Sequence, residues 1–66
     1  MPTVIVEMLE GRTVEQKREL VKRITDAIVE IAQTKPENVR IYFHDIPPFN
    51  LGQSGILRVD QKEKKG

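Results

Sequence analysis

The sequence has 66 residues, of which 38% are hydrophobic and 32% are charged, with a formal net charge of +1 and no cysteine. This length favours one domain over residues 1–66, with a flexible tail at 60–66. The composition argues against disulfides and metal clusters, and the balanced charge and short apolar runs argue against nucleic-acid and membrane partners. We therefore expect a cytoplasmic protein that gains stability by self-association.

The first predicted element is a strand from Pro2 to Leu9, which is rich in β-branched residues. Its period-two pattern gives a wholly apolar face with Val4, Val6 and Met8, and a mixed face with Thr3, Ile5, Glu7 and Leu9. A turn at 10–12 follows, and Gly11 is the expected position of unusual backbone angles.

An amphipathic helix is predicted from Val14 to about Gln33. Thr13 and Gln16 fit a capping box, in which each side chain bonds to the other residue's backbone N–H. Apolar residues repeat at helical spacing and form one stripe: Leu20, Ile24, Ala27, Ile28 and Ile31, with Val21 beside them. Lys17 and the other charged residues are expected off this stripe, which we interpret as core or interface.

A second strand is predicted from Val39 to Ile46, after Pro36 ends the helix. Ile41 and Phe43 face one way, and Arg40, Tyr42 and His44 the other. The two prolines at 47 and 48 end the strand, because neither can donate to a ladder. Residues 49–55, beginning with Phe49, are expected to form a loop, and 56–59 a short last strand.

Element lengths predict the topology. Eight strand residues cover about 26 Å, and a helix of 20 residues returns about 30 Å. The second strand then runs parallel to the first through a right-handed crossover, which gives an α/β fold of the β-α-β type. Two strands and one helix leave a sheet edge and a sheet face uncovered, and another copy of the chain would cover both.

Three residues carry potential chemistry: Pro2, Arg12 and Arg40. Removal of Met1 would leave a secondary amine at Pro2, and an apolar pocket with nearby arginine charge would lower the pKa of that amine. A neutral amine is a competent general base at physiological pH. Arginine holds a carboxylate through two hydrogen bonds and stabilises negative charge on an enolate oxygen.

The sequence resembles the 4-oxalocrotonate tautomerase family over nearly its whole length. The resemblance lies in the start Met1-Pro2, the run Leu9-Glu10-Gly11-Arg12, the helix opening Glu15-Gln16-Lys17, the pair Val39-Arg40 and the loop Leu51–Gly55. It implies a β-α-β subunit of the α+β class, dimers with a four-stranded sheet, and a homohexamer built as a trimer of dimers.

The resemblance also implies a mechanism without a metal or an organic cofactor. Pro2 matches the base that takes the hydroxyl proton of a dienol and delivers it to carbon. Arg12 and Arg40 match the arginines that bind a carboxylate and polarise the 2-oxo end of the substrate. Neighbouring subunits would contribute these residues to one pocket, so that a monomer is expected to be inactive.

Some positions depart from the family pattern and bear on the substrate. Leu51 stands where the family often has a phenylalanine in its hydrophobic wall, although Phe49 lies two residues earlier. Related dehalogenases that hydrate chloroacrylates carry an acid at the position of Gln53 and an arginine at that of Leu9. Gln53 cannot activate water and Leu9 offers no cation, so tautomerisation is favoured over hydration, with Leu9 and Leu51 as apolar substrate contacts.

The predicted function is conversion of a 2-hydroxydienoate such as 2-hydroxymuconate to its unsaturated 2-oxo acid, as in aromatic hydrocarbon catabolism. One alternative is a promiscuous tautomerase of phenylenolpyruvate-like substrates, which the smaller Leu51 would permit. Another is a non-catalytic oligomeric interaction module with the same fold. Tyr42 and His44 are interpreted as strand or interface residues rather than catalytic ones.

Overall fold

The computed structural model describes residues 2–61 of the chain. In sequence order it contains β1 (Thr3–Leu9), α1 (Val14–Ala32), β2 (Arg40–Ile46), β3 (Gly52–Gln53) and β4 (Ile56–Leu57). Short 3₁₀ turns occupy 36–38, 48–50 and 58–60. Asp60, the first residue of the predicted flexible tail, ends the last of these turns, and the tail residues 62–66 lie outside the described residues.

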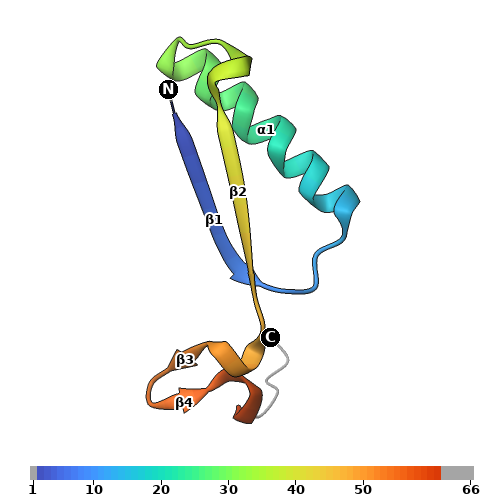
Figure 1. The fold of residues 1–66 in the computed structure, drawn as a ribbon, viewed down its shortest axis with the longest axis vertical. Helices are drawn as coiled ribbons and strands as arrows, with labels where there is room; N and C mark the ends of the chain where they lie inside the picture. Colours follow the sequence, from blue (N-terminus) through green and yellow to red (C-terminus); the bar gives the residue numbers. More distant parts are fainter. Residues whose placement is uncertain (1, 62–66) are drawn as a thin grey trace.

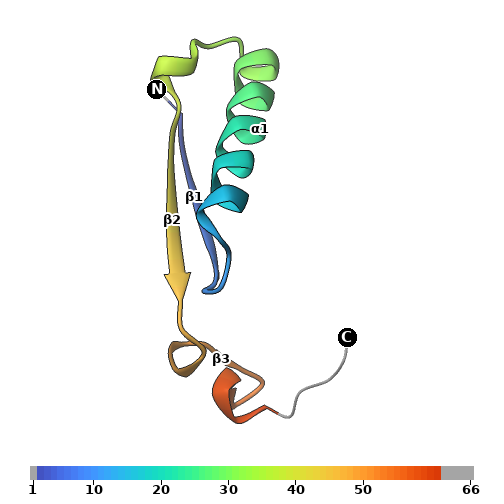
Figure 2. The same ribbon diagram turned by 90° about the vertical axis from the view of Figure 1, so that its right-hand side faces the viewer.

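Strands β1 and β2 lie side by side in one parallel sheet. The register pairs Thr3 with Arg40 at one end and Leu9 with Ile46 at the other. Helix α1 connects the two strands and covers one face of their sheet, while the opposite face stays open (Figure 2). The predicted β-α-β unit with parallel strands is therefore confirmed.

The face of α1 that packs on the sheet differs from the predicted stripe, of which Val21, Ala27 and Ile31 are exposed. Ile31 is 80% exposed, because α1 crosses the strands obliquely (Figure 1) and the covered face shifts toward Thr25 and Val29 near the helix end. Lys17, predicted off the stripe, is half-buried at a position three residues before Leu20. Its side chain lies over the Phe43 ring, with Nζ 5.8 Å from the ring centroid.

The region after β2 also differs from its prediction. Part of the predicted loop forms an antiparallel hairpin in which Gly52 pairs with Leu57 and Gln53 with Ile56. Ser54 and Gly55 both have positive φ, 56° and 78°, as a two-residue hairpin turn requires. The last strand stops at Leu57, because the chain turns at Arg58–Asp60, where the N–H of Gln61 donates to the carbonyl of Arg58 at 3.1 Å.

The described chain has very little interior of its own. None of residues 2–61 is fully buried, and the radius of gyration is 15.3 Å, against about 11 Å expected for a compact chain of this length. Large apolar side chains stay exposed on β1, α1, β2 and β4, among them Ile5 on β1 and Tyr42 on β2. This exposure supports the expectation that further copies of the chain complete the core.

Candidate active site

Pro2 and Arg40 lie at the same end of the sheet. The carbonyl of Pro2 accepts a hydrogen bond from the backbone N–H of Arg40 at 3.1 Å, next to the register pair formed by Thr3 and Arg40. Pro2 is half-buried and Arg40 is exposed. The parallel pairing therefore places the backbones of the predicted base and of one of the two predicted arginines next to each other.

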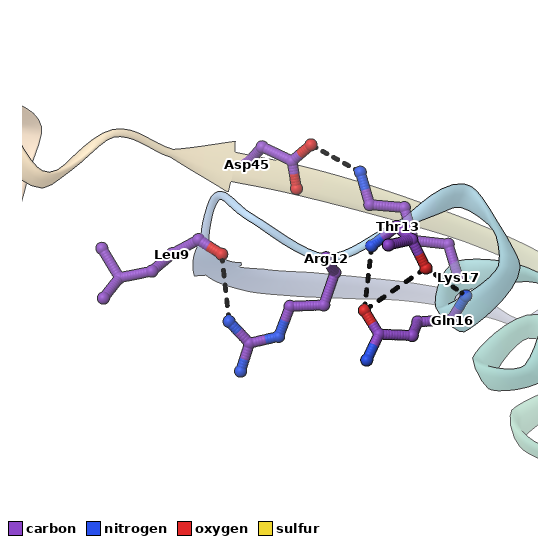
Figure 3. A network of polar contacts seen from close by, with 6 residues as sticks. All are labelled: Leu9, Arg12, Thr13, Gln16, Lys17 and Asp45. Atoms are coloured by element: carbon purple, nitrogen blue, oxygen red, sulfur yellow. Dashed lines mark hydrogen bonds and ion pairs between the residues drawn. The ribbon is translucent and has the colours of Figure 1, made fainter.

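Arg12 lies at the opposite end of β1, in the turn that leads to α1. Gly11 has a φ of 125° in this turn, a conformation that side-chain-bearing residues rarely adopt, which confirms the prediction made for this position. The Arg12 guanidinium donates from Nη1 to the Leu9 carbonyl at 3.5 Å (Figure 3). This bond is long and exposed, so a carboxylate would displace it at little cost.

The start of α1 is capped as predicted. The backbone N–H of Gln16 donates to Oγ1 of Thr13 at 3.1 Å, and the backbone N–H of Thr13 donates to Oε1 of Gln16 at 2.9 Å (Figure 3). These two bonds satisfy N–H groups that the first helical turn would otherwise leave free. The cap thus defines where the turn that carries Arg12 ends.

The two predicted apolar contacts lie at the same end of the sheet as Arg12. Leu9 is half-buried and is the last residue of β1. Leu51 is half-buried where the chain enters the hairpin, beyond the carboxyl end of β2. One chain thus holds Pro2 and Arg40 at one end, and Arg12, Leu9 and Leu51 toward the other.

The length of β1 separates these two groups. Seven strand residues span about 23 Å, which is far more than a single arginine side chain can cover. The chain alone therefore does not bring Pro2 and Arg12 together. A pocket that uses both must take them from different copies, as the family resemblance implies.

The open sheet face carries polar groups that the prediction left out of the chemistry. Nδ1 of His44 lies 3.4 Å from Oε2 of Glu7, its cross-strand neighbour, and both side chains are more than half exposed. Within residues 2–61 no three histidine or acidic side chains gather as metal ligands. In the same part of the chain, no helix has the length and apolar character that a membrane crossing needs.

Sequence reasoning missed one contact near Arg12. Nζ of Lys17 pairs with Oδ2 of Asp45 at 2.5 Å, which ties the second turn of α1 to the end of β2 (Figure 3). The helical spacing could have revealed it, since Lys17 lies three residues before Leu20 and therefore shares its face.

Comparisons with known proteins agree with this architecture. A family model described as "Tautomerase enzyme" matches residues 2–61. The chain is 41% identical over 56 residues to 2-hydroxymuconate tautomerase of Comamonas testosteroni. The aligned region covers 85% of this chain and 89% of the relative. It also resembles the crystal structure of YwhB, a homologue of 4-oxalocrotonate tautomerase, with a TM-score of 0.88 and 34% identity. The match covers 92% of this chain and 100% of YwhB.

A third similar structure is that of a protein described as a heterohexamer. The heterohexamer 4-oxalocrotonate tautomerase of Chloroflexus aurantiacus matches with a TM-score of 0.85 and 29% identity, over 94% of this chain and 100% of that one. The fold and the matched length define a small β-α-β enzyme subunit. The chain belongs to the tautomerase family, and the protein is an enzyme of the keto–enol tautomerase class.

Proposed function

We propose that the protein isomerises a 2-hydroxydienoate such as 2-hydroxymuconate to its unsaturated 2-oxo acid, with the amine of Pro2 as the base. The backbone bond between Pro2 and Arg40 carries this proposal, because it places a potential base and a residue able to bind a carboxylate at the same end of the sheet. The 2-hydroxymuconate tautomerase of Comamonas testosteroni, 41% identical, supports the substrate class. Removal of Met1, which lies outside the described residues, is part of the proposal.

The proposed reaction needs one proton carrier and no external electrons. The amine of Pro2 takes the hydroxyl proton of the dienol, the carbonyl forms, and electron density moves along the conjugated chain. The protonated amine then returns the proton to carbon, which completes the isomerisation. Arg40 would stabilise the charge on the oxygen, and Arg12 would hold a carboxylate through two hydrogen bonds. No step in this scheme calls for a metal or an organic cofactor.

We also propose that the pocket forms between copies of the chain, arranged as a homohexamer. Two-fold pairing through the free edge of β1 makes the two β1 strands antiparallel and forms a four-stranded sheet. The far end of one β1, with its Arg12, then lies beside Pro2 of the other. Pairing through β2 would keep the two β1 strands apart, so the β1 edge is favoured. The heterohexameric relative supports an assembly of six subunits.

The experiment is a comparison of Pro2→Ala with Pro36→Ala, a proline exposed in the turn before β2. With 2-hydroxymuconate as substrate, Pro2→Ala is expected to lower kcat by about 10²-fold, whereas Pro36→Ala retains the rate. Mass spectrometry on the same samples shows whether Met1 has been removed. An unchanged rate in Pro2→Ala, or full activity in protein that retains Met1, would refute the proposed base.

A parallel assay distinguishes the alternative functions. Turnover of phenylenolpyruvate in preference to 2-hydroxymuconate would favour the promiscuous tautomerase that Leu51 would permit. No turnover of either substrate by the Met1-free oligomer would favour a non-catalytic interaction module. The cytoplasmic location and a role in aromatic hydrocarbon catabolism remain part of this proposal.

A further inference from the structure

The turn that carries Arg12 is fastened at both ends to the same short piece of β2. At its start, the backbone N–H of Glu10 donates to the carbonyl of Ile46 at 3.0 Å. After its end, Lys17 in α1 pairs with Asp45 at 2.5 Å. Asp45 and Ile46 are neighbours in sequence, so the end of β2 sets the position of both sides of the turn.

The Lys17–Asp45 contact differs from the other ion pairs of residues 2–61. It joins the helix to the sheet, whereas the pair Lys22–Asp26, for example, links two residues of α1. Its side chains are 24% and 41% exposed, against 72% and 68% for the helix-surface pair. Water therefore screens the Lys17–Asp45 pair less, and this pair holds its geometry better.

We propose that Lys17 and Asp45 are positioning residues that hold the Arg12 turn in place for substrate binding. Figure 3 shows the arrangement: the ion pair lies on one side of the capped turn, and the Arg12 guanidinium extends on the other. Lys17 and Asp45 act through Arg12 and do not touch the substrate. This inference rests on the proposed role of Arg12 as a carboxylate-binding residue.

The contacts of the turn explain why the Lys17–Asp45 ion pair is needed to position Arg12. Among the contacts within residues 2–61, Arg12 has one weak anchor, the 3.5 Å bond to the Leu9 carbonyl, which binding of a carboxylate would replace. Gly11 adds backbone freedom beside it. An arginine binds a carboxylate through two parallel N–H···O bonds only when its backbone is well placed. The ion pair restricts the helix side of the turn and so reduces the freedom that substrate binding must remove.

The first experiment compares Lys17→Met with the matched control Lys22→Met. Methionine keeps an apolar stem over Phe43 and helix propensity, but it removes the charge. Lys17→Met is expected to raise KM for 2-hydroxymuconate about fivefold and to leave kcat within about twofold. Lys22→Met is expected to change neither. A purely structural role would lower kcat through loss of folded enzyme at constant KM, which would overturn the proposal.

The second experiment repeats Lys17→Met in an Arg12→Ala background, where the turn has no guanidinium to position. The KM effect is then expected to vanish, because the two changes act on one interaction. A further rise in KM would mean that Lys17 acts by another route. The exchange Lys17→Asp with Asp45→Lys restores the pair and is expected to return KM toward its original value.

These results also separate failure of the positioning role from failure of the proposed function. If Arg12→Ala raises KM and Lys17→Met does not, Arg12 binds the substrate and the ion pair has no positioning role. If Arg12→Ala itself leaves KM unchanged, the proposed role of Arg12 is wrong, whatever Lys17→Met does.

Discussion

A mixing experiment tests whether one pocket draws on two chains. Pro2 and Arg12 lie at opposite ends of the seven-residue strand β1, about 23 Å apart by strand geometry. We therefore expect the impaired variants Pro2→Ala and Arg12→Ala to complement each other. In an equal, random mixture each residue is intact in half of the chains, so about one quarter of the pockets hold both intact residues.

The assay is turnover of 2-hydroxymuconate after the two variants are unfolded together, refolded and compared with wild-type protein treated identically. Each variant refolded alone, and the two mixed without unfolding, provide the baselines. Recovery of about a quarter of the wild-type rate agrees with pockets shared between chains. A rate no higher than these baselines, from a mixture that has demonstrably exchanged subunits, would refute the reasoning.

Two further predictions concern stability and assembly. Thr13→Ala removes half of the capping box with Gln16 and is expected to lower the free energy of unfolding by about 1 kcal/mol. At fixed protein concentration this lowers Tm by about 4–8 °C, which circular dichroism measures. An unchanged Tm would contradict the prediction. Ile5→Lys places a charge on the open sheet face, where Ile5 is 56% exposed. In sedimentation it is expected to shift the protein toward smaller species, whereas the conservative control Ile5→Val is not. Retention of the wild-type mass by Ile5→Lys would argue against that face as an interface.

The local elements follow closely from the sequence. The helix begins at Val14 as predicted, because the Thr13 and Gln16 side chains cap it. The alternation in β2 correctly separates Ile41 and Phe43, which face α1, from the exposed residues Arg40, Tyr42 and His44. Such features depend on residues within a few positions of one another, so a single sequence contains enough information to place them.

The hairpin and the Lys17 contact could not be predicted with the same ease. Ser54 adopts a left-handed conformation beside Gly55, and serine is not a strong signal for that conformation. Lys17 has the charge of a surface residue, yet it lies against Phe43 because its stem is apolar and Asp45 is within reach of its amine. At Ser54 the backbone angle departs from the conformation that serine prefers. At Lys17 the contacts with Phe43 and Asp45 override the preference of a charged residue for the solvent.

The sequence by itself determined the two parallel strands, the capped helix between them, and the chemically distinctive residues Pro2, Arg12 and Arg40. Only the tertiary structure decided which ends of the elements meet, with the backbone of Arg40 bonded to that of Pro2 and the Arg12 turn held against the end of β2. The reason is that strand order and register fix which ends of the elements meet, and both depend on contacts between residues distant in sequence. The same register brings Asp45 and Ile46 to the two sides of the Arg12 turn.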